Sequence, residues 1–157
     1  MARGTRAVQL LEQAGIGYTL HEYDPVAGAE SYGEAVADAL GVDPRRLFKT
    51  LVADVDGRPV VGIVPVSGKL SLKRLARAAS GKHAVMANPT QAQRLTGYVV
   101  GGISPFGQRK ALPMFLDTSA CDHDTIWVSA GRRGLQVQLA PRELVAITGA
   151  VVADLAR

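Results

Sequence analysis

Residues 48–66 read FKTLVADVDGRPVVGIVPV, and this stretch decides the fold class. Its two apolar runs, 48–55 and 59–66, are rich in valine, a residue type that packs well on the pleated surface of a sheet. Residues 56–58, Asp-Gly-Arg, stand between the runs as a short polar turn with a glycine, which is a signal for a hairpin. The stretch therefore predicts two neighbouring strands joined by a tight turn.

Capping residues, prolines and glycines predict helices on both sides of this hairpin. Thr5 is placed to cap a helix that ends at Gly15. Ser31 and Glu34 form a capping box for a second helix. The predicted helices cover residues 6–14, 32–40, 72–79, 89–95 and 142–148, and a short helical turn begins at 43–44. The further predicted strands cover residues 18–23, 83–86, 98–100, 114–117, 125–129 and 135–139.

Strands follow strands in this order, and the helices are grouped between them. That order is typical of an α+β fold with a mixed, mostly antiparallel sheet and surrounding helices. No linker of low complexity and no internal repeat divides the 157 residues, so we expect a single domain covering residues 1–157.

The composition excludes several classes of protein. Apolar residues make up 47% of the chain, enough for a core without disulfides or a structural metal. The single cysteine, Cys121, cannot form a disulfide within the chain, which fits a reducing compartment. No apolar run approaches the roughly 18 residues of a membrane span, and the N-terminus lacks the apolar stretch of a secretory signal. We therefore expect a cytoplasmic location.

The charges are unevenly distributed along the chain. Residues 57–116, which we call the acid-free interval, contain nine lysines and arginines and no acidic residue, although the net charge of the whole chain is only +4. This segregation favours an anionic partner such as a phosphate backbone. A solvated surface that became basic is the alternative.

The segment GGISPFGQRK at residues 101–110, the glycine loop, lies inside the acid-free interval. Glycines let backbone N–H groups turn toward a ligand and hold an anion or a developing oxyanion. They also suit a tight turn between two strands, and the residues alone favour neither interpretation. Lys49 has two interpretations as well. It shares a strand face with the apolar Leu51 and Ala53, so it either extends past them to solvent or points into a pocket.

A metal site and an enzyme nucleophile find little support in the sequence. The run Cys-Asp-His-Asp at 121–124 lies in one short loop, whereas zinc sites usually draw ligands from two places. A solvated turn is the better interpretation. Cys121 has no obvious activating partner. We expect neither a metal nor a cofactor.

Several motifs resemble those of the YbaK/EbsC family of aminoacyl-tRNA deacylases. They are LLEQAGIGYTLHEYD at 10–24, FKTLV at 48–52, LTGYVVGGISPFGQRKALP at 95–113 and IWVSAGRRGL at 126–135. The likeness covers roughly residues 6–156. Because the family is related to the editing domain of bacterial prolyl-tRNA synthetases, the resemblance implies that fold, with a curved sheet. The segment FGQRK at 106–110 favours the YbaK members, which remove cysteine from Cys-tRNA(Pro).

The resemblance also implies roles for individual residues. The family's catalytic lysine falls on Lys49. Positions that bind the substrate fall on Tyr23, Gly101, Gly102, Ile103, Ser104, Pro105 and Ser129. We expect tRNA phosphates to meet five cations of the acid-free interval, Lys73, Arg74, Arg77, Arg109 and Lys110. Three positions depart from the family pattern, because Tyr32 replaces a phenylalanine, Ala130 a glycine, and Gln136 an aspartate found in some members.

The resemblance implies a trans-editing reaction without an enzyme nucleophile. The thiol of the substrate cysteine attacks its own ester carbonyl and releases tRNA and a cyclic thiolactone, while Lys49 hydrogen-bonds the carbonyl or a ribose oxygen. The partners are then tRNA(Pro) charged with cysteine and, for the choice of tRNA, prolyl-tRNA synthetase. One alternative is water-driven cleavage of Ala-tRNA(Pro). Another is a tRNA-binding module without catalysis, which the presence of Lys49 and the glycine loop disfavours.

Overall fold

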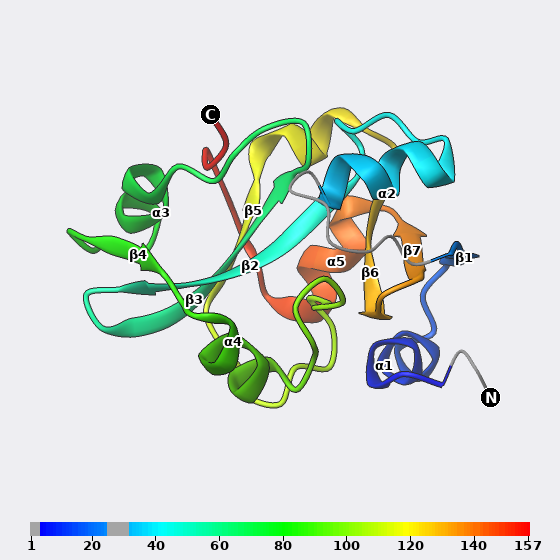
Figure 1. Ribbon diagram of the computed structural model, residues 1–157, viewed down its shortest axis with the longest axis horizontal. Helices are drawn as coiled ribbons and strands as arrows, with labels where there is room; N and C mark the ends of the chain where they lie inside the picture. Colours follow the sequence, from blue (N-terminus) through cyan, green and yellow to red (C-terminus); the bar gives the residue numbers. More distant parts are fainter. Residues whose placement is uncertain (1–3, 25–31) are drawn as a thin grey trace.

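The computed structural model describes residues 4–24 and 32–157 and shows the expected α+β fold (Figure 1). The helices are α1 (Arg6–Ala14), α2 (Tyr32–Leu40), α3 (Leu72–Ala78), α4 (Pro89–Thr96) and α5 (Pro141–Thr148), and a short 3₁₀ helix spans Thr118–Asp122. The strands are β1 (Thr19–Glu22), β2 (Phe48–Val55), β3 (Arg58–Pro65), β4 (Ala84–Met86), β5 (Met114–Asp117), β6 (Ile126–Arg132), β7 (Leu135–Leu139) and β8 (Val151–Ala153).

The strands form two sheets that meet at the beginning of β2. The larger sheet has the order β4-β2-β3-β5-β8, and the smaller sheet has the order β1-β7-β6. Pairing is antiparallel in the smaller sheet and between β2 and its two neighbours, and parallel between β3, β5 and β8. An isolated parallel bridge between Leu47 and Trp127 joins the two sheets. The expected mixed and mostly antiparallel arrangement is confirmed.

β2 lies inside the fold because it carries apolar side chains on both faces. Phe48 and Val52 belong to the largest cluster of buried residues, which also includes residues of α1, α5 and the smaller sheet. On the opposite face, Ala53 and Val55 pack with Leu75 of α3 in a second cluster. A strand that is covered on both faces has a nearly continuous apolar sequence, which is why the hairpin was recognisable.

The helix ends follow the capping signals in the sequence. The side-chain oxygens of Thr5, Ser71 and Asn88 each accept a hydrogen bond from a backbone N–H in the first turn of their helix. Helices α1, α4 and α5 each end at a glycine in the left-handed conformation. The predicted cap at Ser31 lies outside the described residues. None of the helices in residues 4–24 and 32–157 has the length and apolar character of a membrane-spanning segment.

The prediction of a strand at residues 98–100 is wrong. Tyr98 is buried, and its hydroxyl donates a hydrogen bond to the backbone oxygen of Phe106 at 2.5 Å. The N–H of Gly102 donates to the backbone oxygen of Val99 and closes a turn. The apolar run therefore anchors an irregular segment through one aromatic side chain, and it has no place in a sheet.

Other differences concern short elements. The chain after Asp43 forms a turn where a helical turn was predicted, because the Asp43 carboxylate accepts hydrogen bonds from the backbone N–H and the guanidinium of Arg45. Strand β8 and the 3₁₀ helix were not predicted. β8 is three residues long and pairs in parallel at the edge of the larger sheet, so it carries little periodic signal.

Candidate active site

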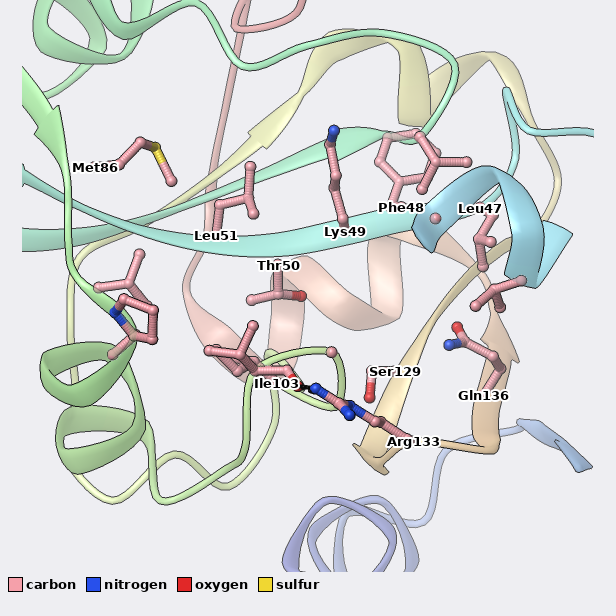
Figure 2. A pocket seen from close by; sticks show the side chains of 18 of the residues that line it. Leu47, Phe48, Lys49, Thr50, Leu51, Met86, Ile103, Ser129, Arg133 and Gln136 are labelled. Atoms are coloured by element: carbon pink, nitrogen blue, oxygen red, sulfur yellow. Dashed lines mark hydrogen bonds between the residues drawn. The ribbon is translucent and has the colours of Figure 1, made fainter. Parts of the chain in front are cut away.

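A cavity of about 520 Å³ opens beside the first half of β2 (Figure 2). Its lining comes from β2, α2, the segment from β4 into α4, the glycine loop, and the strands β6 and β7. Apolar side chains form most of the surface. The polar or charged side chains in the lining belong to Lys49, Thr50, Ser129, Arg133 and Gln136.

The backbone of β2 contributes to the cavity at Thr50. Strand β4 covers the outer edge of β2 only at residues 53–55. Across the inner edge, the N–H of Val66 donates to the backbone oxygen of Leu47 at 2.8 Å. Because hydrogen-bonded pairs alternate along an antiparallel ladder, the odd-numbered residues of β2 bond to β3 and the even-numbered ones direct their N–H and C=O outward. The backbone groups of Thr50 therefore point away from β3, toward the edge of β2 that β4 does not cover.

Close packing explains the glycines of the glycine loop. Gly101 has a φ of +91°, in the left-handed region that favours glycine. A Cβ on Gly102 would lie 2.8 Å from backbone atoms of Arg132, the last residue of β6, and of Arg133 in the turn that follows. The guanidinium of Arg133 donates from Nε and Nη2 to the backbone oxygen of Val100 at 2.9 and 2.7 Å. These contacts fasten the loop to the smaller sheet.

Part of the predicted substrate loop reaches the cavity. Gly101 and Ile103 line it, whereas Gly102, Ser104 and Pro105 are buried and do not. The hydroxyl of Ser104 accepts the N–H of Phe106 at 3.2 Å, so this serine stabilises the loop from inside. Pro105 lines a separate, smaller hollow.

Lys49 lines the same cavity, but its ammonium is directed away from the glycine loop. Figure 2 shows the side chain leaving β2 on the side opposite to Thr50 and Ile103. The pKa of Lys49 is lowered by burial, raised by the negative charge of Glu34 and lowered by the positive charge of Lys69, with a net decrease. The lysine and the loop thus approach the cavity from opposite faces of one strand.

Ser129, Gln136 and Tyr23 lie on or beside neighbouring strands of the smaller sheet. Ser129 is opposite Gln136 in the register of β6 and β7. The Gln136 amide donates to the hydroxyl of Tyr23 at 3.4 Å, and the Ser129 hydroxyl accepts the N–H of Gly131 at 3.2 Å. Tyr23 does not line the cavity, so it contacts the site through Gln136.

The cations predicted to bind tRNA fall in two places. Lys73, Arg74 and Arg77 belong to α3. Arg109 and Lys110 lie beside the last turn of α4, where their backbone N–H groups donate to the backbone oxygens of Thr96 and Leu95. Figure 1 shows α3 well apart from the glycine loop. Arg74 donates to the Asp154 carboxylate at 3.3 Å and to the backbone oxygen of Ala156, which ties it to the C-terminal segment. Arg109 and Lys110 are exposed.

Sequence reasoning missed Thr50 and Arg133 as parts of the site. Thr50 is next to Lys49 in the FKTLV motif, and strand alternation alone places it on the other face. That face becomes a cavity wall only because the smaller sheet and the glycine loop lie opposite it. Arg133 lies in the turn between two strands, and the sequence does not indicate which backbone oxygen its side chain reaches.

The described lining contains no nucleophile paired with a base. No cysteine, histidine, aspartate or glutamate among the described residues lines the cavity. Cys121 is exposed in the 3₁₀ helix and lies outside the lining. The described arrangement can orient and polarise a bound group.

Known proteins share this sequence and this geometry. The family described as aminoacyl-tRNA editing domain matches residues 27–147. EbsC of Enterococcus faecalis, named as a candidate Cys-tRNA(Pro)/Cys-tRNA(Cys) deacylase, is 36% identical over 154 residues, which cover 96% of this chain and 92% of EbsC. The multifunctional Ser/Thr-tRNA deacylase ProXp-y of Escherichia coli K12 is 28% identical over 121 residues, 74% of this chain and 72% of ProXp-y.

A solved structure supports the same relationship. The crystal structure of a candidate trans-editing enzyme for prolyl tRNA synthetase matches with a TM-score of 0.83 and 29% identity, covering 97% of this chain and 96% of the other. The family match extends over most of the sequence, and the similarity to EbsC over nearly all of it. The chain therefore belongs to the aminoacyl-tRNA editing domains of the YbaK/EbsC type, a family of aminoacyl-tRNA deacylases.

Proposed function

We propose that this deacylase removes cysteine from Cys-tRNA(Pro) in trans. The observation that carries the proposal is the chemistry of the cavity, whose described lining holds no acidic, histidine or cysteine side chain. A site of this kind suits a substrate that brings its own nucleophile, and a cysteinyl ester does so. The name of EbsC, with 36% identity, supports the same substrate.

The reaction balances within the substrate. The cysteine sulfur forms a bond to its own carbonyl carbon, and the ester bond to the ribose oxygen breaks. The products are the thiolactone of cysteine and a tRNA whose ribose hydroxyl takes up the proton of the thiol. An aminoacyl ester is already activated, so orientation and polarisation of the carbonyl are the tasks of the protein. Lys49 is the donor that we assign to the carbonyl or the ribose oxygen.

This chemistry accounts for selectivity that shape alone does not provide. A difference of one small group in a pocket is worth about 1–3 kcal/mol, which separates cysteine poorly from alanine or serine. A reaction that uses the thiol as reagent excludes alanine because alanine has no attacking atom. The choice of tRNA is a separate matter, and we propose prolyl-tRNA synthetase as the partner that provides it.

A deacylation panel tests the proposal. tRNA(Pro) is charged with cysteine, S-methylcysteine, alanine, serine or proline, and release of the amino acid is followed with and without prolyl-tRNA synthetase. We expect rapid loss of cysteine from tRNA(Pro), formation of cysteine thiolactone, and no cleavage of the ester between S-methylcysteine and tRNA(Pro). Rapid cleavage of the S-methylcysteinyl or alanyl ester would show that water attacks the ester carbonyl. A panel without any cleavage would contradict the proposed activity.

A further inference from the structure

The wall of the cavity contains buried polar atoms that have no partner within the protein. Among the described residues, four buried side-chain polar atoms lack a hydrogen bond, and two of them, Thr50 Oγ1 and Gln136 Oε1, belong to lining residues. Thr50 is 7% exposed and Gln136 6%. Buried polar groups are nearly always hydrogen-bonded, so two orphaned oxygens in one cavity point to a ligand that completes them.

Both groups belong to the same wall of the cavity. Figure 2 shows Thr50 leaving β2 toward the side where Ser129 and Ile103 lie, and the amide of Gln136 extending from β7 into the same region. Ser129, opposite Gln136 in the strand register, is also buried. Thr50, Ser129 and Gln136 therefore form a polar floor, and the apolar side chains of the lining surround it.

The polar floor carries no charge. Its three members are neutral, and the ammonium of Lys49 leaves β2 on the opposite side. An amide oxygen and two hydroxyls accept hydrogen bonds from a neutral donor, while an ammonium buried there would lack a counter-charge. The chemistry fits a small side chain that ends in a thiol or a hydroxyl.

We infer that Thr50 and Gln136 bind the thiol or hydroxyl of the aminoacyl side chain and make the pocket selective for residues with a heteroatom at the β-carbon. The inference deepens the proposed function and rests on it, because it assigns the aminoacyl end of the substrate to this floor. It predicts that a serine side chain is bound nearly as well as a cysteine side chain, although serine lacks the thiol that drives cleavage. Binding of the aminoacyl side chain and attack by its thiol would then each contribute separately to the choice of substrate.

Binding of uncleavable analogues tests the inference apart from catalysis. The probes are 3′-aminoacylamino-3′-deoxyadenosines carrying cysteine, serine, 2-aminobutyrate or alanine, and the dissociation constants are measured by NMR titration. 2-Aminobutyrate is the key comparison because it replaces the hydroxyl of serine by a methyl group of similar size. In the wild-type protein we expect the serine analogue to bind about tenfold more tightly than the 2-aminobutyrate analogue, the order expected for one buried polar group left without a partner.

Three variants identify the residues. Thr50→Val keeps the shape and removes the hydroxyl, so it should reduce this preference to about twofold or less, whereas Thr50→Ser should retain it. Gln136→Met should act like Thr50→Val. Gln138→Met is the matched control, because it makes the same change on β7 at a residue outside the cavity lining, and it should keep the preference. Melting temperatures show whether each variant is folded. If the Thr50→Val protein is not folded, Thr50→Ala is used in its place.

The outcomes separate this inference from the proposed function. A wild-type protein without preference for serine over 2-aminobutyrate overturns the inference even if it cleaves Cys-tRNA(Pro) rapidly. The same holds if both Thr50→Val and Gln136→Met keep the preference. A protein that shows the preference and loses it in these variants, yet cleaves no Cys-tRNA(Pro), supports the recognition site and contradicts the proposed activity.

Discussion

At the scale of single residues, Lys49 combines a functional prediction with a stability prediction. Its side chain is half-buried, and its pKa is lowered, first by burial. A folded-state pKa below the ordinary value of about 10.4 means that protonation favours the unfolded chain, so this group adds stability only as the pH rises toward that value. Lys49→Met should therefore melt at the wild-type temperature or slightly above it at neutral pH, and it should abolish deacylation of Cys-tRNA(Pro).

Lys69→Met is the matched control for this variant. Lys69 is exposed and does not line the cavity, but its positive charge lowers the pKa of Lys49. It should retain activity within about twofold, since exposed substitutions rarely disturb a site. Deacylation by Lys49→Met at a rate near that of the wild type would remove this lysine from the mechanism. The direction of its ammonium in Figure 2 makes that experiment informative.

Asp117 is a buried carboxylate whose role is structural. It is 3% exposed and accepts hydrogen bonds from Ser119 and from the backbone N–H groups of Leu155 and Ala156. Burial alone would raise its pKa, but these hydrogen bonds outweigh burial, and the pKa is lowered. Asp117→Asn should lower the free energy of unfolding by about 3 kcal/mol at pH 7, because an amide cannot accept all of these bonds.

The pH dependence checks the cause of that loss. A lowered folded-state pKa means that the stabilisation by Asp117 is complete above about pH 3.9, the ordinary aspartate pKa, and is lost as the pH falls through the lower folded-state value. Urea unfolding of both proteins should therefore show a difference at pH 7 that shrinks in acid. A difference that stays constant down to the acid limit would contradict a role of the charged carboxylate.

At the scale of elements, the contact between the glycine loop and the β6–β7 turn should control activity. A Cβ at Gly102 would overlap backbone atoms of Arg132. Because the contact is between two backbone segments, the overlap can be relieved only if the glycine loop moves away from Arg132. Gly102→Ala should lower kcat/KM for Cys-tRNA(Pro) by at least about tenfold and cost about 1–3 kcal/mol of stability, as overpacking does. Enzyme assays and thermal melts measure the two effects.

Gly17→Ala provides the comparison for this variant. A Cβ at Gly17 meets nothing within 4 Å, and its φ lies outside the left-handed region. The same chemical change at this exposed position should leave activity unchanged and stability equal or slightly higher. If Gly102→Ala behaves in the same way, the close approach of the loop has no bearing on the reaction.

Elements whose signals are local were predictable, and those that depend on distant partners were not. The helix at residues 6–14 follows from a cap at Thr5 and a glycine stop, and both contacts are made within the helix. The apolar run at 98–100 resembles a strand in isolation, but Tyr98 bonds to Phe106 and the run joins no sheet. β8 forms because a neighbouring strand accepts it, and a single sequence does not show that neighbour.

The candidate site shows the same division. The position of Lys49 on a strand follows from alternation, and the motif resemblance marks the glycine loop as a site element. The orphaned oxygens of Thr50 and Gln136 are properties of packing between two sheets, so no pattern along the chain indicates them. The sequence also does not show that Arg74 is bound to the C-terminal segment.

At the scale of the whole molecule, the two groups of cations should contribute separately to tRNA binding. Each lysine or arginine that contacts a phosphate adds about 0.7 to 0.9 to the slope of log affinity against log salt. The pairs Lys73→Gln with Arg77→Gln and Arg109→Gln with Lys110→Gln should each weaken tRNA binding and flatten that slope. Arg74 is left unchanged because its removal would disturb the C-terminal segment.

The control pair lies outside the acid-free interval. Arg142→Gln with Arg157→Gln removes two exposed cations and should leave the salt slope unchanged. A minimal aminoacyl ester without the tRNA body should be cleaved equally by all three double variants. If the control pair flattens the slope as much as the other pairs, the segregation of charge along the chain has no bearing on tRNA.

The pairing of β1 with β7 has a consequence for folding kinetics. His21 and Gln138 are hydrogen-bonded across 117 positions of sequence, and Thr5 bonds to the backbone of Ala130 across 125. Folds rich in such distant contacts fold in milliseconds to seconds, whereas a hairpin such as β2–β3 forms within about 10 μs. The polar floor of the cavity joins β2 to the smaller sheet, so deacylase activity should return in the slowest refolding phase, after the hairpin is already protected from hydrogen exchange.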